Sequence, residues 1–94
     1  YQIALRLNPN RAEVHNNLGN AYNAVGWTDR AIEHYQIALR LNPNRAEVHN
    51  NLGVAYERKG LFNEAIKEYQ TALRLNPEFN TARDNPNKIL KGKK

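Results

Sequence analysis

The sequence predicts an all-α solenoid, in which antiparallel helix pairs stack along one axis. Two observations carry this prediction. Residues 1–19 recur letter for letter as residues 35–53, and 24 of residues 1–34 match residues 35–68 at an offset of 34. Within each period, apolar residues at helical spacing form two segments, which glycines and Asn-Pro pairs separate. A fixed period of this length indicates that one helical hairpin is the repeating unit.

The first helix of the unit is expected from Ala12 to Val25. Its apolar side chains fall at i, i+4, i+7 and i+11 and therefore share one face: Val14, Leu18, Ala21 and Val25. We expect Val14, Leu18 and Tyr22 to be the core residues of this helix. Gly26 and its copy Gly60 then supply the left-handed residue that ends such a helix.

The second helix is expected to begin near Thr28, with Thr28 or Asp29 as its N-cap. Small and aromatic residues share its inner stripe: Ala31, Tyr35 and Ala38. Asn42-Pro43 closes this helix, because proline donates no backbone hydrogen bond and constrains the residue before it. The same pair occurs at Asn8-Pro9 and Asn76-Pro77, where we expect equivalent turns.

Small residues in this pattern predict close packing between helices. We expect Gly19 and Gly53 to let the second helix of the same unit approach the first. Ala31 and Ala38 are expected to admit the first helix of the following unit. A single hairpin cannot bury its own apolar face, so stacking of neighbouring units builds the core.

These positions resemble the signature of the tetratricopeptide repeat, whose 34-residue period also fits. The first copy carries seven signature residues in order: Leu18, Gly19, Tyr22, Ala31, Tyr35, Ala38 and Pro43. The second copy repeats all of them: Leu52, Gly53, Tyr56, Ala65, Tyr69, Ala72 and Pro77. The chain departs from the family at His15 and His49, which stand where the family often has Trp.

The resemblance covers the whole chain and implies a single right-handed array of αα-hairpins. Residues 1–11 would form part of a second helix, and residues 12–45 and 46–79 would form two full repeats. Residues 80–94 would form a terminal capping helix with a basic tail.

Pro86 interrupts the last expected helix. In frame it takes the place of Leu18 and Leu52, and a proline inside a helix costs about 3 kcal/mol. We therefore expect a kink there, or a restart near Asp84 with Pro86 in the first turn.

The residue content argues against an enzyme. The 94-residue chain has no cysteine, no phosphate-binding glycine loop and no converging acid–base pair. His15 and His49 are repeat copies that lack a second ligand at i+3 or i+4. We interpret both as packing residues, and we expect neither a metal nor a cofactor.

The net charge of +5 is concentrated in the C-terminal tail. The last ten residues contain no acid and four lysines: Lys88, Lys91, Lys93 and Lys94. Such a tail can contact nucleic acid, but we interpret it as a solvated terminus and expect no nucleic-acid partner. No apolar run approaches the roughly 20 residues needed to cross a bilayer, so we expect no membrane span.

The resemblance implies that a peptide or protein segment binds the concave surface, which the first helices line. The residues expected in this groove are Glu13, Asn16, Asn17, Asn20, Asn50, Asn51, Arg58 and Asn85. Asn17, Asn51 and Asn85 give one asparagine per layer, and this row resembles the asparagine ladder of O-linked N-acetylglucosamine transferases. The alternative is that asparagine is simply a tolerated polar residue at this position.

The family's clamp for a C-terminal carboxylate fits this chain less well. It would need lysine in place of Asn16, and lysine and arginine in place of Thr81 and Asn85. Without those cations, a carboxylate that loses its water in the groove is not compensated. We therefore expect no carboxylate clamp.

The two ends of the array predict a weak homo-oligomer. Tyr1, Ile3 and Leu5 lack the first helix that would cover them, and Ile89 and Leu90 belong to a last helix without a successor. The expected function is a non-catalytic protein-interaction scaffold, and the alternative is a self-assembling structural module. Because the sequence does not begin with Met, we interpret it as a fragment. The near-identical copies suggest recent duplication or design.

Overall fold

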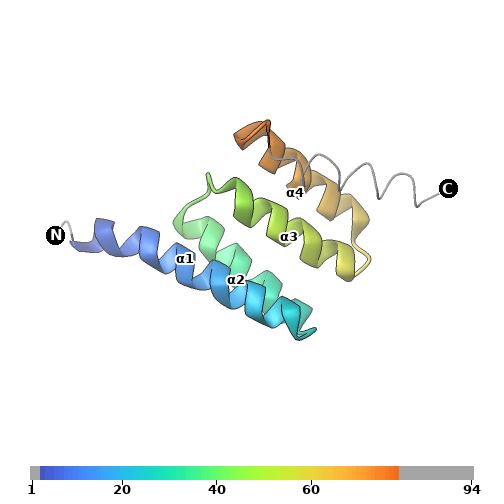
Figure 1. The fold of residues 1–94 in the computed structure, drawn as a ribbon, viewed down its shortest axis with the longest axis horizontal. Helices are drawn as coiled ribbons and strands as arrows, with labels where there is room; N and C mark the ends of the chain where they lie inside the picture. The colour runs from blue at the N-terminus through green and yellow to red at the C-terminus, as the bar shows by residue number, and fades with distance from the viewer. Residues whose placement is uncertain (1–2, 79–94) are drawn as a thin grey trace.

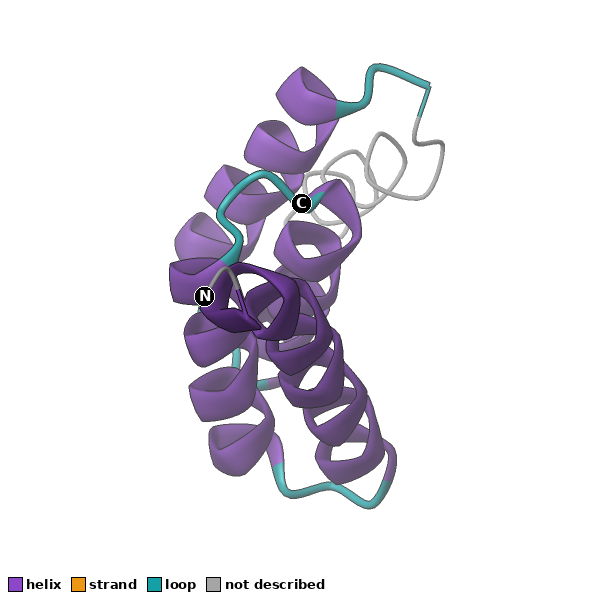
Figure 2. Ribbon diagram, turned by 90° about the vertical axis from the view of Figure 1, so that its left-hand side faces the viewer, coloured by secondary structure: helices purple, strands orange, loops and turns teal. Residues whose placement is uncertain are grey.

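The computed structural model describes the backbone of residues 3–78 and the side chains of residues 11–78. Four helices follow one another there (Figure 1): α1 Ile3–Ala24, α2 Thr28–Leu41, α3 Ala46–Arg58 and α4 Phe62–Leu75. They run antiparallel to their chain neighbours, and short loops join their ends (Figure 2). The predicted all-α hairpin fold is confirmed. Several residues of interest lie outside the described part: Tyr1, Asp84, Asn85, Pro86, Ile89, Leu90 and the four tail lysines.

Four of the five expected helix-end signals within residues 11–78 act as predicted. Gly26 and Gly60 adopt positive φ angles of 91° and 81° where α1 and α3 end. Asn42 and Asn76 are the C-caps of α2 and α4, and each donates its backbone N–H to an alanine carbonyl four residues earlier. The expected N-cap is wrong, because Thr28 is already the first helical residue and no side chain caps α2.

Each hairpin is closed by a tyrosine ring that lies against a glycine. A Cβ atom added at Gly19 would come within 2.5–2.9 Å of three ring atoms of Tyr35. The second hairpin repeats this contact between Gly53 and Tyr69, at 2.6–3.0 Å. The close approach expected from the two glycines is therefore confirmed.

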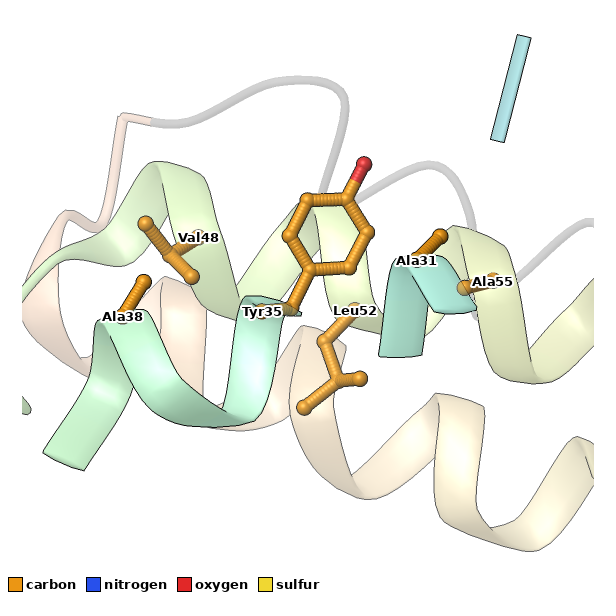
Figure 3. Packing of buried hydrophobic residues seen from close by; sticks show 6 residues of the cluster. All are labelled: Ala31, Tyr35, Ala38, Val48, Leu52 and Ala55. Atoms are coloured by element: carbon orange, nitrogen blue, oxygen red, sulfur yellow. The ribbon is translucent and has the colours of Figure 1, made fainter. Parts of the chain in front are cut away.

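The main core lies between α2 and α3 and is built from residues of both helices (Figure 3). Three of its side chains come from α2 and three from α3: Ala31, Tyr35, Ala38, Val48, Leu52 and Ala55. All six are at most 2% exposed. The alanines of α2 thus admit the first helix of the next unit, as expected.

The turn expected at Asn8-Pro9 does not occur, because α1 continues through it from Ile3 to Ala24. At the equivalent Pro43, Asn44 donates its backbone N–H to Asn42 Oδ1 at 3.4 Å. The Nε2 of His49 also contacts the Pro43 carbonyl at 2.9 Å. His15 takes the place of His49 in the first copy, and its ring contacts His34 of α2. The division into repeats at residues 12, 46 and 80 stays a prediction.

The core expected on α1 is also wrong in part. Val14 is 53% exposed and Leu18 is 38% exposed, whereas their copies Val48 and Leu52 are 0% and 2% exposed. The missing turn explains this difference. Val48 and Leu52 are covered by α2, which the turn at Asn42-Pro43 brings against α3. Residues 3–8 instead continue α1 and cannot cover Val14 and Leu18.

This asymmetry predicts different costs for two substitutions in identical sequence surroundings. At concentrations where the chain is monomeric, we expect Leu52→Ala to lower the free energy of unfolding by about 2–5 kcal/mol. Leu18→Ala removes a side chain that is partly in water, so we expect a loss below about 1 kcal/mol. Urea unfolding followed by circular dichroism measures both, and equal losses would contradict the described burial.

Candidate functional site

The first helices of the two hairpins, α1 and α3, are joined by polar contacts along their length. Arg45 Nη2 lies 2.7 Å from Glu13 Oε1 at one end. In the middle, Asn51 Nδ2 donates to Asn16 Oδ1 at 3.1 Å. At the other end, Arg58 Nη1 donates to the Asn23 carbonyl at 3.0 Å. These contacts fix the register of the two helices, so residues one repeat apart lie at matching heights.

Two asparagines expected in the groove, Asn16 on α1 and Asn50 on α3, are buried. Asn16 is 1% exposed and Asn50 is 6% exposed, so the surface exposure expected of them is wrong. Asn16 accepts the bond from Asn51, which explains its place in the packing. Sequence spacing placed these residues beside the groove, but it could not show that one amide would be used to join the repeats.

The remaining groove candidates lie at the surface of α1 and α3. Glu13, Asn17, Asn20 and Arg58 are exposed, and Asn51 is partly exposed. Asn17 and Asn51 are equivalent positions of the two repeats, and each directly follows a buried asparagine in the sequence. No pocket forms among the described residues.

Core tyrosines hold two residues of this surface in place. The Tyr35 hydroxyl donates to Asn20 Oδ1 at 2.6 Å. Val54 stands at the equivalent place in the second repeat and offers no acceptor, so the Tyr69 hydroxyl donates to Glu57 Oε1 at 2.8 Å. Burial raises the pKa of Tyr35 to about 12, and burial followed by the Glu57 contact raises that of Tyr69. Both hydroxyls therefore remain donors at neutral pH. Repeat spacing alone did not reveal this role.

The two histidines of α1 and α3 have different partners despite their identical neighbours. His15 Nδ1 lies 3.0 Å from His34 Nδ1 on α2. His49 Nδ1 lies 2.8 Å from Glu68 Oε1 on α4, and its Nε2 contacts the Pro43 carbonyl. Two acceptors favour the protonated ring of His49, which donates from both nitrogens. The His pair can share only one proton between its facing nitrogens.

These contacts shift the two pKa values in opposite directions. The hydrogen bond that His49 donates to Glu68 is the main cause that raises the pKa of His49, against the effect of its burial. Burial, followed by the charges of His34 and Arg11, lowers the pKa of His15. Across residues 11–78, no three ligand side chains gather where they could hold a metal ion. Within the described helices, none is long and apolar enough to cross a membrane.

Comparison with known families decides the identity of the fold. A model described as TPR repeat matches residues 19–60, and two models described as tetratricopeptide repeat match residues 1–33 and 46–79. The chain belongs to the tetratricopeptide repeat family. Members of this family mediate protein–protein interactions and are generally non-catalytic. No curated protein matches the chain.

Solved tetratricopeptide structures share its fold. MamA is 28% identical with a TM-score of 0.86, over 90% of this chain and 50% of its own. The first TPR of Spaghetti (RPAP3), bound to the HSP90 peptide SRMEEVD, is 27% identical with a TM-score of 0.79, over 82% and 63%. The Arabidopsis OM64 TPR domain is 24% identical with a TM-score of 0.79, over 80% and 62%. This tetratricopeptide chain thus spans between half and two thirds of the length of these three structures.

The histidine contacts predict that one substitution reverses the pH response of the first hairpin. His34→Glu gives His15 the carboxylate partner that His49 has, so we expect the pKa of His15 to rise above 6.5, its ordinary value. In the unchanged chain, the contribution of His15 to stability is present above pH 6.5 and is lost as pH falls through its lowered pKa. In the variant, it is present below pH 6.5 and is lost as pH rises through the raised pKa.

An NMR titration of the imidazole protons measures this shift. His49 serves as the internal control, because its partner Glu68 is unchanged and its pKa stays raised. A pKa of His15 that remains lowered in the variant would contradict the described pairing.

Proposed function

We propose that this chain is a non-catalytic module that binds an extended peptide or protein segment on the open face of α1 and α3. The observation that supports this most is the pair Asn17 and Asn51. They occupy equivalent positions on two first helices that the polar contacts hold in register. Peptide binding by a neighbour of the same fold, the first TPR of Spaghetti (RPAP3), supports the same proposal.

Primary amides suit the backbone of an extended peptide, because each can donate to a carbonyl and accept from an N–H. Asn51 gives one donor to Asn16, which orients its amide and leaves its oxygen and second N–H for a ligand. Asn17 is exposed on the neighbouring helix. The two would contact the backbone without selecting side chains, and Asn85 would extend the row.

Side-chain selection would come from the charged groups at the two ends of this face. Glu13 and Glu47 lie at one end, 2.7 and 3.8 Å from the same Arg45 nitrogen. Arg58 lies at the other end and is exposed. A bound segment would therefore meet two carboxylates and the Arg45 guanidinium at one end, and the Arg58 guanidinium at the other. We propose that it is oriented by this difference.

A carboxylate clamp is not part of this proposal. Asn16 stands where the clamp would need lysine, and it is buried and bonded to Asn51. A free carboxylate at this place would face an amide instead of a cation, and its desolvation would not be compensated.

The affinity expected from Asn17 and Asn51 alone is low. A net hydrogen bond contributes about 0.5–1.5 kcal/mol, whereas a dissociation constant of 1 mM already corresponds to about 4 kcal/mol. Useful binding therefore needs side-chain contacts, further repeats or a second copy of the chain.

Two alanine substitutions test the asparagine row. A fluorescent peptide selected on the 94-residue chain from a displayed random library serves as the probe. We expect Asn17→Ala with Asn51→Ala to weaken its binding by about 1–3 kcal/mol, or about 5–150-fold, measured by anisotropy. Asn63→Ala is the matched control, because Asn63 is exposed on α4, a second helix. Unchanged affinity with unchanged helicity would refute the proposal that Asn17 and Asn51 contact the peptide.

The same anisotropy measurement tests whether a free C-terminal carboxylate contributes to peptide binding. The probes are SRMEEVD, the peptide bound by the first TPR of Spaghetti, and SRMEEVD with an amidated C-terminus. We expect the dissociation constants of the two peptides for this chain to agree within about threefold, since Asn16 stands where the clamp would have a lysine. A preference of tenfold or more for the free acid would show that a clamp exists.

A further inference from the structure

One stretch of sequence adopts two different conformations in this chain. Residues 3–19 and 37–53 are identical. In the second copy, Asn42-Pro43 separates α2 from α3, and the two helices pack against each other. In the first copy, the same residues form one continuous helix within α1.

The continuous helix leaves a defined apolar face uncovered. Val48 and Leu52 are buried against Ala38 and other residues of α2, with Leu39 packed beside them. Their copies Val14 and Leu18 are 53% and 38% exposed. The two pairs have the same neighbours in sequence, so the exposed pair offers the surface that α2 occupies on α3.

The sequence that fits this face is present in the same helix. Residues 3–7 are identical to residues 37–41, the part of α2 that brings Ala38 and Leu39 to the core. A helix rises 1.5 Å per residue and cannot fold back on itself. Within a continuous α1, residues 3–7 therefore cannot reach Val14 and Leu18 of their own chain.

We propose that two copies of this chain pair through their α1 helices, with residues 3–7 of each lying over Val14 and Leu18 of the other. The pairing is antiparallel, as α2 is to α3, and every contact occurs twice about a two-fold axis. Exchange of an identical element between protomers is a low-cost route to a dimer. Here the straightened Asn8-Pro9 segment is the hinge that a turn would otherwise close.

This interface does not depend on peptide binding. It uses residues 3–7, Val14 and Leu18. None of these is among the proposed peptide contacts, which are Asn17, Asn51, Glu13, Glu47 and Arg58. Val25, which directly follows the last residue of α1 and is 66% exposed, lies well beyond the segment that would be covered. It provides a matched position outside the interface.

Disulfide trapping distinguishes exchange between chains from a fold-back within one chain. The chain has no cysteine, so Ala4→Cys with Val14→Cys introduces the only thiols. These positions copy Ala38 and Val48, which belong to one buried cluster in the described core (Figure 3). We expect oxidation to give a species of twice the chain mass on a non-reducing gel. The control, Ala38→Cys with Val48→Cys, crosslinks within one chain.

The mass in solution provides the second readout. Light scattering of the unaltered chain is expected to show a mass that rises toward the dimer with concentration. Leu18→Glu abolishes this rise, and Val25→Glu leaves it unchanged. An intrachain disulfide alone, no crosslink from Ala4→Cys with Val14→Cys, or a dimer that survives Leu18→Glu would each overturn the proposal.

Discussion

The contact between a tyrosine ring and a glycine backbone determines the geometry of both hairpins. Gly19 and Gly53 have no side chain, so Tyr35 and Tyr69 lie directly against α1 and α3. The rings are almost completely buried, and their hydroxyls then reach surface residues of the first helices. With the hairpin closed at this distance, the alanines of α2 meet α3 and set the next repeat beside the first.

On this repeated scaffold, the polar contacts differ from one repeat to the next. His15 faces His34, whereas its copy His49 faces Glu68. Tyr35 donates to Asn20, whereas Tyr69 donates to Glu57 because Val54 offers no acceptor. Apolar and small residues thus repeat closely, and variation is concentrated at positions that contact polar partners or solvent. A surface with fixed geometry and variable chemistry suits a protein-interaction module.

The hairpin fold, the glycine turns and the core between α2 and α3 could be predicted from the sequence, because helical spacing and the signature residues determine them locally. The exposure of Val14 and Leu18 could not, since it depends on the conformation of Asn8-Pro9. Identical residues give a turn in one copy and a helix in the other, so tertiary contacts decide between them. The burial of Asn16 likewise depends on its partner Asn51 across the repeats.

The sign of one stability change tests the central role of the tyrosine–glycine contact most directly. In an open helical position, Gly→Ala stabilises a protein by about 0.5–1 kcal/mol. We expect Gly53→Ala to destabilise this chain by about 1–3 kcal/mol instead, because its Cβ would overlap the ring of Tyr69. Urea unfolding of the variant and the unaltered chain gives the difference. A stability that is unchanged or increased would contradict the account.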